Sequence, residues 1–215
     1  MSNWCCQNGL FLNCNKTVLI NFHTPQNKLD HSLYFNLDNK SIRNVETTKF
    51  LGLNISSDLD WHCHASYITS KLNNICYLII RCRTFVDIGV LKSVYYGYFQ
   101  PVSTYGIMFW GGSPIINRIF IIQKRILRLM TFTNRGESAK PLFKSTGILT
   151  LPSLYIYECV TFVFNNKHMF TKNSDVHCRD TRHMDDLRLQ RHRLKLYHSP
   201  QQCLPPLCKI LQCIT

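Results

Sequence analysis

The sequence predicts an α+β protein in which helices dominate, and two observations support that prediction. In the first 61 residues the apolar side chains come in short β-branched or alternating runs between turn-forming residues, which is typical of strands. After residue 61 they recur every three or four residues, which is typical of helices. We therefore expect a small antiparallel region over residues 1–61, helices over residues 62–135, and a helical C-terminal extension over residues 136–215. The last ~17 residues show no clean period.

Four runs in the first region are predicted strands, and one of them contains a glycine. Residues 17–22 form a β-branched run, residues 33–37 alternate, and residues 42–45 are again apolar at both ends. The fourth run covers residues 50–55 and has Gly52 inside it. Because a glycine within a strand usually marks a bulge or a close approach of another backbone, we expect one of these at Gly52.

Apolar side chains at helical spacing predict two helices between residues 62 and 101 and another over residues 153–165. The second is expected to end at Pro101, because a proline inside a helix removes a hydrogen bond and clashes with the preceding turn. Aromatic residues at helical spacing usually belong to the core, so we assign Tyr95, Tyr98 and Trp110 to it. The apolar faces are Ile68, Leu72, Ile75 and Ile79 in the first helix and Leu91, Val94, Tyr95 and Tyr98 in the second.

A third predicted helix has one apolar and one cationic side. It is expected to begin at Ser113-Pro114, with the serine as cap and the proline at the first position. An apolar stripe follows at helical spacing, and basic residues occupy the arc beside it. The stripe is Ile115, Ile119, Ile122, Ile126 and Met130, and the basic residues are Arg118, Lys124, Arg125 and Arg128.

Positive charge is concentrated in the same part of the chain. The sequence has 25 Lys and Arg against 12 Asp and Glu, a net charge of +13. Residues 1–61 are neutral overall, whereas residues 118–144 contain seven basic side chains and one acidic one. A basic surface of this size favours a polyanion as partner, most simply nucleic acid. The alternative is a solvated positive surface that only maintains solubility.

Composition also indicates a compartment. No apolar run approaches the ~20 residues of a membrane helix, and the first residues lack the order of a signal peptide. We therefore expect no membrane partner. The eleven cysteines are interpreted as reduced thiols of a cytoplasmic or nuclear chain.

Candidate metal ligands are present but poorly spaced. Asp185 and Asp186 lie between basic residues in a polar stretch, so we interpret them as surface charges and not as a magnesium-binding pair. His62 and His64 would share a face if they lay on a strand. Neither they nor the remaining candidates have the paired spacing of a zinc site, and we predict no metal in this chain. The remaining candidates are Cys63, His177, Cys178, Cys203, Cys208 and Cys213.

Short motifs spread over most of the chain follow one another in a specific order, although each is weak alone. The first group is Trp4, Asn8-Gly9-Leu10, Leu12-Asn13, Lys16-Thr17, residues 48–53 and Leu59-Asp60-Trp61. The second group is Tyr105-Gly106-Ile107, Trp110-Gly111, Gln123-Lys124-Arg125, Pro141-Leu142-Phe143, residues 148–152, His177 and Thr181-Arg182. Over residues 3–198 this order resembles the reverse transcriptase of non-LTR retrotransposons of the jockey and LINE-like kind.

The resemblance implies a role for each part of the chain. Residues 1–61 would be the end of the polymerase palm, residues 62–135 the thumb, and residues 136–215 the segment beyond it. Lys16 would match a lysine near the triphosphate that could act as general acid on the leaving pyrophosphate. Phe50, Leu51 and Gly52 would match the primer grip, a hairpin whose backbone approaches the end of the primer. The thumb helices, with the basic helix among them, would follow the phosphates of the template–primer.

The resemblance also implies what the chain lacks. The family's metal-binding aspartates, including those of a Tyr-x-Asp-Asp turn, would precede residue 1, and no Tyr-x-Asp-Asp occurs in these 215 residues. The complete polymerase would need Mg²⁺, whereas this chain is expected to hold no cofactor. We therefore expect a truncated RNA-directed DNA polymerase, inactive alone, that binds an RNA or DNA template–primer and belongs with the rest of a retrotransposon polyprotein. Two alternatives stay open: part of an active enzyme whose palm is missing from the gene model, or a domesticated basic RNA-binding protein.

Overall fold

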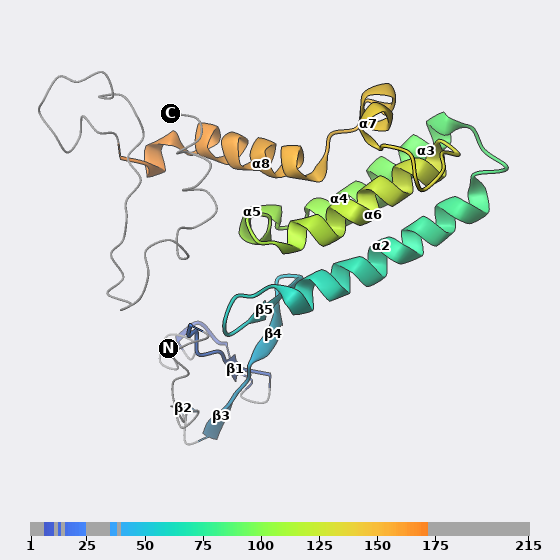
Figure 1. Cartoon of the computed structure of the whole chain (residues 1–215). Helices are drawn as coiled ribbons and strands as arrows, with labels where there is room; N and C mark the ends of the chain where they lie inside the picture. The colour runs from blue at the N-terminus through green and yellow to red at the C-terminus, as the bar shows by residue number, and fades with distance from the viewer. Residues whose placement is uncertain (1–6, 11–12, 14–15, 25–34, 38–39, 172–215) are drawn as a thin grey trace, which may run out of the picture. The chain divides into compact units, whose positions relative to one another are not determined.

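The structure is a computed structural model that describes residues 7–10, 13, 16–24, 35–37 and 40–171. It is α+β and mostly helical, as predicted (Figure 1). The chain divides into two compact units, residues Met1–Tyr67 and Ile68–Thr215, which are described separately below. The boundary expected after residue 61 coincides with the start of the first long helix, whereas the two units meet a few residues inside that helix.

The first unit contains a three-stranded sheet in which β3 (Lys40–Asn44) is central. β2 (Phe35–Leu37) pairs antiparallel with β3, and Phe35 lies opposite Ile42. β1 (Val18–Leu19) pairs parallel with β3 on the other side, so the expectation of a purely antiparallel region is wrong for this strand. A parallel pair needs a crossover connection, and the residues between β1 and β3, which include β2, provide it.

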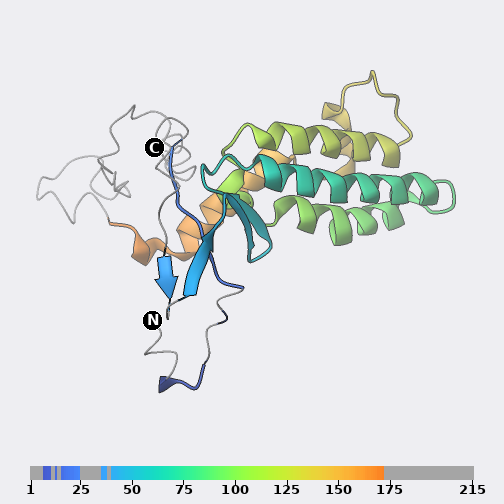
Figure 2. The ribbon, with the colours of Figure 1, turned by 90° about the horizontal axis from the view of Figure 1, so that it is seen from below.

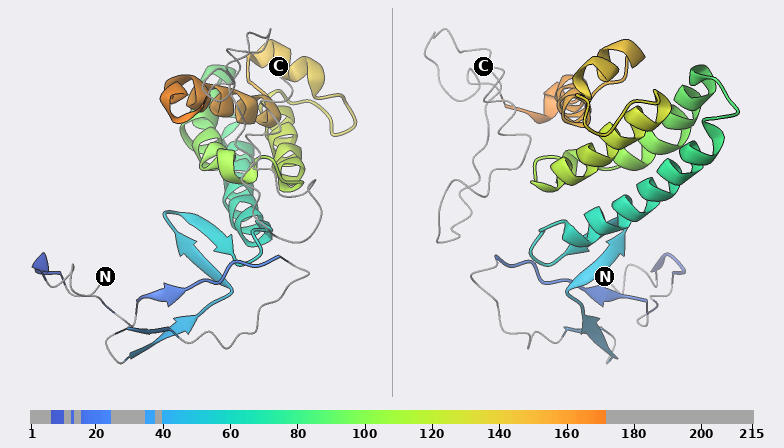
Figure 3. Two further views of the ribbon diagram at one scale, coloured as in Figure 1. Left: turned by 90° about the vertical axis from the view of Figure 1, so that its left-hand side faces the viewer. Right: turned by 45° about the vertical axis from the view of Figure 1, so that its right-hand side comes forward.

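A separate two-stranded hairpin replaces the continuous strand predicted over residues 50–55. β4 (Thr47–Phe50) pairs antiparallel with β5 (Leu53–Ser56), and Phe50 lies opposite Leu53 (Figure 3). The two turn residues both have positive φ, 45° at Leu51 and 84° at Gly52. Turns with two positive φ angles match the twist of a hairpin, and glycine adopts such angles without strain. Gly52 therefore marks a tight turn and not a bulge.

The helix α2 (His62–Cys82) starts from a capped loop. The Oδ1 atom of Asp60 accepts a hydrogen bond from the backbone N–H of His62 at 2.9 Å and another from the hydroxyl of Ser56 at 3.1 Å. A carboxylate in this position satisfies a helix N–H that has no partner within the helix. Of the predicted apolar face, Ile68, Leu72 and Ile79 are buried as expected, whereas Ile75 is only half-buried and Cys76 is buried beside it.

The second unit continues with a helix that passes through Pro101 instead of ending there. It consists of α3 (Ile88–Val94), a π-helical turn η1 (Tyr95–Phe99) and α4 (Gln100–Thr104). Because Pro101 has no N–H to donate to the previous turn, a regular α-helix would be strained there. In the π turn the N–H of Gln100 donates to the carbonyl of Tyr95, five residues back, which widens the helix just before the proline.

The described part of the second unit, which ends at Thr171, contains four further helices and a short 3₁₀ turn. The helices are α5 (Ile107–Trp110), α6 (Ile115–Met130), α7 (Lys140–Thr146) and α8 (Leu151–Asn165), and the turn is η2 (Lys167–Met169). The long helices α2 and α6 lie beside the composite helix α3–α4 (Figure 2). α8 packs on α4, α5 and α6, and α7 contacts α6. The hydroxyl of Thr150 caps α8 by accepting from the N–H of Ser153, so this helix begins two residues before the predicted start.

In the part of the chain that the structure describes, no single helix is both long and apolar enough to cross a membrane. Among the described helices, α7 and α8 pass that test when they are taken together, and they are bent by 57° relative to each other.

Candidate nucleic-acid interface

The helix α6 has a buried apolar side and an exposed cationic side, as the sequence predicts. All five predicted stripe residues, from Ile115 to Met130, are buried. Arg118 and Arg125 are exposed and lie two turns apart, seven residues along the same side of the helix. No acidic residue occurs between Ile115 and Met130. The exposed side of α6 therefore presents positive charge without a compensating carboxylate on the same helix.

The two other predicted cations of α6 are held by local contacts. The ammonium nitrogen of Lys124 lies 4.2 Å from the ring centroid of Phe120, within the range of a cation–π interaction. The Nε and Nη2 atoms of Arg128 donate to the backbone carbonyl of Glu137 at 3.2 and 2.9 Å. Both contacts leave the positive charge in place. The four cations thus share one side of the helix, but Arg118 and Arg125 are more exposed than Lys124 and Arg128.

The predicted cap of α6 is wrong. The hydroxyl of Ser113 donates to the carbonyl of Trp110 at 2.6 Å, and the helix start has no side-chain cap. The side chain of Ser113 is turned toward this carbonyl at the end of α5, and its oxygen caps no N–H at the start of α6. Ser113 therefore joins α5 to α6, whereas a cap would have stabilised α6 itself.

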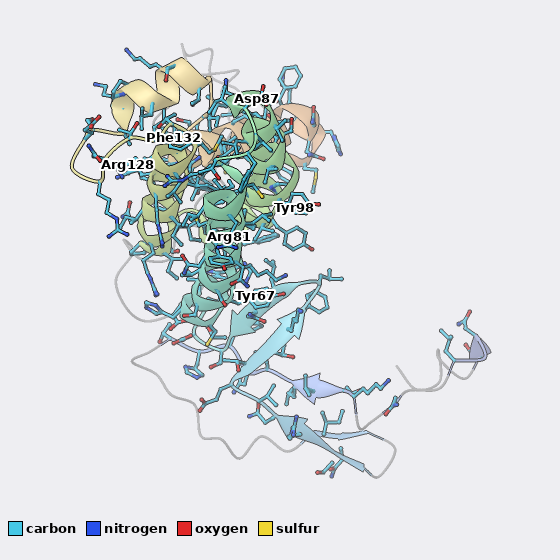
Figure 4. The ribbon with its side chains drawn as sticks, turned by 90° about the vertical axis from the view of Figure 1, so that its right-hand side faces the viewer. Tyr67, Arg81, Asp87, Tyr98, Arg128 and Phe132 are labelled. Atoms are coloured by element: carbon cyan, nitrogen blue, oxygen red, sulfur yellow. The ribbon has the colours of Figure 1, made fainter. Side chains whose placement is uncertain are left out.

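The C-terminal end of α6 adds a cation that the sequence did not reveal. Arg83, just after α2, lies with its guanidinium carbon 5.0 Å from the ring centroid of Phe132 and donates to the carbonyl of Leu129 at 3.4 Å. Arg128 and Phe132 lie at the same end of α6 (Figure 4). Arg83 and Leu129 are 46 residues apart, so spacing within one helix gives no sign of this contact.

Two of the three aromatic residues assigned to the core are buried there. Tyr95 and Trp110 are fully buried, and the indole N–H of Trp110 donates to the carbonyl of Tyr105 at 3.0 Å. Tyr98 is 61% exposed and its assignment to the core is wrong (Figure 4). The π turn shifts the register of the helix, so that Phe99 takes the buried place and stacks on Tyr95 with ring centroids 5.1 Å apart. Tyr98 belongs instead to the exposed aromatic side chains Tyr96, Tyr98, Tyr105 and Phe109.

Gln123 sits in the core, although the sequence groups it with the basic residues Lys124 and Arg125. Its Nε2 atom donates to the hydroxyl of Tyr95 at 2.8 Å and to the carbonyl of Leu149 at 2.9 Å. Its Oε1 atom accepts from the N–H of Leu151 at 2.8 Å. Burial raises the pKa of Tyr95 to about 12. Because every polar atom of the amide has a partner, Gln123 links α6, the π turn and the start of α8, and it fixes which side of α6 faces outward.

The residues matched to the polymerase palm belong to the first unit. Phe50 and Leu51 are exposed at the tip of the β4–β5 hairpin, Leu51 by 74%. The ammonium of neighbouring Lys49 lies 5.2 Å from the ring centroid of Tyr67. Lys16 is exposed just before β1. The predicted primer grip therefore has the hairpin geometry that the resemblance implies, and its role remains a prediction, as does that of Lys16.

The predicted metal candidates do not assemble in the described part of the chain. His62 and His64 lie in the first turn of α2 and not on a strand, so they point to different sides: His62 is exposed and His64 is buried. The Nδ1 atom of His64 accepts from the N–H of Asn54 at 3.3 Å, and burial lowers its pKa. The described residues contain no group of three or more His, Cys, Asp or Glu that could hold a metal ion. Asp185, Asp186, His177, Cys178 and the three tail cysteines lie outside the described residues.

No family model, no curated protein and no solved structure matches the chain, so the resemblance to non-LTR reverse transcriptases rests on the order of its motifs.

Proposed function

We propose that this chain holds a template–primer duplex through the exposed cations of α6, as the thumb-like part of a non-LTR retrotransposon reverse transcriptase. One observation supports this most directly: the basic side chains lie opposite a fully buried stripe and are therefore presented to solvent on a rigid helix. Phosphate contacts of this kind supply most of the affinity of a protein that does not read sequence.

The spacing of the cations suits a duplex. Arg118 and Arg125 are separated by seven residues, which is about 10 Å along the helix axis. Successive phosphates on one strand of a duplex advance by about 3.4 Å along its axis, so the two guanidinium groups can reach phosphates about three nucleotides apart. Lys124 and Arg128, held by Phe120 and by the carbonyl of Glu137, lose little further freedom when they contact a phosphate.

The same proposal assigns no polymerase activity to these 215 residues alone. Phosphoryl transfer depends on metal ions held by carboxylates, and the sequence contains no Tyr-x-Asp-Asp turn. Lys16 as a general acid and the hairpin tip at Phe50, Leu51 and Gly52 as a primer grip would act only together with a palm that supplies those carboxylates and Mg²⁺. The chain's own contribution is to bind and position nucleic acid.

Fluorescence anisotropy with an RNA template annealed to a labelled DNA primer tests the binding. If the four cations each neutralise one phosphate, a plot of the logarithm of the association constant against the logarithm of the salt concentration has a slope of about −3 to −4. This slope corresponds to a roughly 100-fold loss of affinity between 50 and 200 mM salt. Arg118→Gln and Arg125→Gln should each reduce the slope by about 0.9. Lys167→Gln, which also removes one exposed charge but lies beyond α8, is the matched control and should leave the slope unchanged. A flat salt profile for the unaltered chain would contradict the proposal.

Primer extension with the purified chain, Mg²⁺ and nucleotides tests the second part separately. We expect no synthesis above background on a template that the chain binds. Template-dependent extension would show that metal-binding carboxylates are present elsewhere in the chain, and it would leave the binding role of α6 unaffected.

A further inference from the structure

The helix α8 has an apolar outer side in addition to its buried inner side. Its inner side, which includes Leu151, Leu154 and Cys159, is buried, and α8 packs on α4, α5 and α6. On the opposite side four apolar residues at helical spacing are exposed, Phe164 by 66%. These residues, which we call the outer stripe, are Ile156, Tyr157, Val160 and Phe164.

An uncharged outer stripe is unusual for a surface helix. A helix with a polar outer face is normal at a protein surface, whereas one that is apolar all round is normally covered on every side. α8 carries a single charged residue, Glu158, which is half-buried and does not belong to the stripe. The chain therefore presents an apolar surface that gains stability if another apolar segment covers it.

We infer that residues 203–214 of the same chain cover the outer stripe of α8. Eight of these twelve residues are apolar or cysteine, and the segment has one charge, at Lys209. This composition contrasts with residues 172–200, which contain seven basic and four acidic side chains. An apolar segment gains stability when apolar surface covers it, and the outer stripe of α8 is such a surface.

The length of the connection permits this contact. The described chain ends at Thr171, shortly after α8, and about thirty residues separate it from the apolar segment. α8 has 15 residues and is therefore about 22 Å long. About thirty residues span up to roughly 100 Å when extended, so the segment reaches any point of the outer stripe.

A segment of this chain fits the stripe better than a second copy does. A stable interface between folded proteins uses about 20 to 30 residues from each partner. The outer stripe has four, which suits a short peptide. Because the peptide is covalently attached, the contact is intramolecular and does not depend on protein concentration.

Photo-crosslinking from the stripe tests the inference on the full chain. Tyr157 is replaced with p-benzoylphenylalanine, and Tyr77, exposed on α2, is replaced in the same way as the matched control. At micromolar concentration we expect Tyr157→p-benzoylphenylalanine to give a product of monomer mass in which the cross-linked peptide comes from residues 201–215, and the control to give no such product. A cross-link to a second copy, to another part of the chain, or to nothing would overturn the inference.

A second measurement uses substitutions in the segment itself. Leu207→Asp with Leu211→Asp should increase the fluorescence of a bound apolar dye severalfold and abolish the Tyr157 cross-link. Gln202→Asp with Gln212→Asp adds the same charge at polar positions and should do neither. Equal dye binding by the two double variants would overturn the inference. None of these changes touches α6, so the result is independent of nucleic-acid binding.

Discussion

The helices α6 and α8 are of similar length and pack against each other, but they differ in what they present to solvent. α6 buries an isoleucine stripe and exposes cations, whereas α8 buries one apolar face and exposes another. Both have well-packed inner sides, so the fold alone does not require the difference. On the proposals above, the two outer sides would make different contacts: α6 with a charged partner in water, and α8 with an apolar segment.

Gln123→Met is the change expected to affect this pair of helices most. Methionine has a similar volume but leaves the hydroxyl of Tyr95, the carbonyl of Leu149 and the N–H of Leu151 without the amide that joins them. Since each buried unpaired group costs about 1–3 kcal/mol, we expect a loss of about 3–5 kcal/mol of unfolding free energy. Urea denaturation measures it, with Asn117→Met as the exposed control on α6. If Gln123→Met lost no more unfolding free energy than Asn117→Met, the hydrogen bonds of Gln123 would not stabilise the core as proposed.

Gly111→Ala tests the inner side of α8. A Cβ atom at Gly111 would lie 2.5 Å from the carbonyl oxygen of Ile107 and 2.5 Å from the ring of Tyr155 on α8. Because neither the backbone nor the packed ring moves easily, we expect a loss of about 2 kcal/mol. Gly97→Ala, where a Cβ meets nothing within 4 Å, should instead gain about 0.5–1 kcal/mol from helix propensity. Melting temperatures of the two variants should therefore move in opposite directions, and a shared direction would count against this packing.

The pH dependence of stability should report on the buried side of α6. The pKa of Tyr95 is raised to about 12 in the folded protein and is about 10 when unfolded, so the unfolded form loses its proton first. The contribution of Tyr95 to the free energy of unfolding is therefore fully present below pH 10. It falls by about 1 kcal/mol per pH unit as the pH rises toward 12. Tyr95→Phe should lose less stability than the unaltered chain between pH 9 and pH 11. Cys76, whose pKa burial raises to about 11, is present in both proteins and cancels in the difference.

The sequence predicted α6 better than its surroundings because the information needed was local. An isoleucine every three or four residues sets the buried side, and the cations between them must then face outward. Gln123 could not be placed in this way. Its partners Tyr95, Leu149 and Leu151 are 26 to 28 residues distant, so only the packed structure shows that this amide is satisfied inside the core.

The errors elsewhere come from backbone conformations that apolar patterns do not report. Regular helical spacing places Tyr98 in the core, whereas the π turn before Pro101 changes the register of the helix by part of a turn and leaves this side chain exposed. The apolar run over residues 50–55 predicts one strand, whereas the structure has a hairpin there, because Leu51 adopts a positive φ that residues other than glycine rarely adopt. In the candidate interface, the positions of the cations followed from spacing, but the contact of Arg128 with the Glu137 carbonyl and the place of Arg83 did not.

Two exposed isoleucines give the smallest and most direct test of the difference between the outer sides. Ile121 lies among the cations of α6 and is 62% exposed, and Ile156 lies in the outer stripe of α8 and is 49% exposed. If both faced only water, replacing either with asparagine would change stability by no more than about 0.5 kcal/mol. If residues 203–214 cover α8, Ile156→Asn places an amide in an apolar contact and should cost about 1 kcal/mol, while Ile121→Asn stays within the smaller range. Urea denaturation of the full chain separates these outcomes, and equal effects at the two positions would mean that α8, like α6, meets only solvent on its outer side.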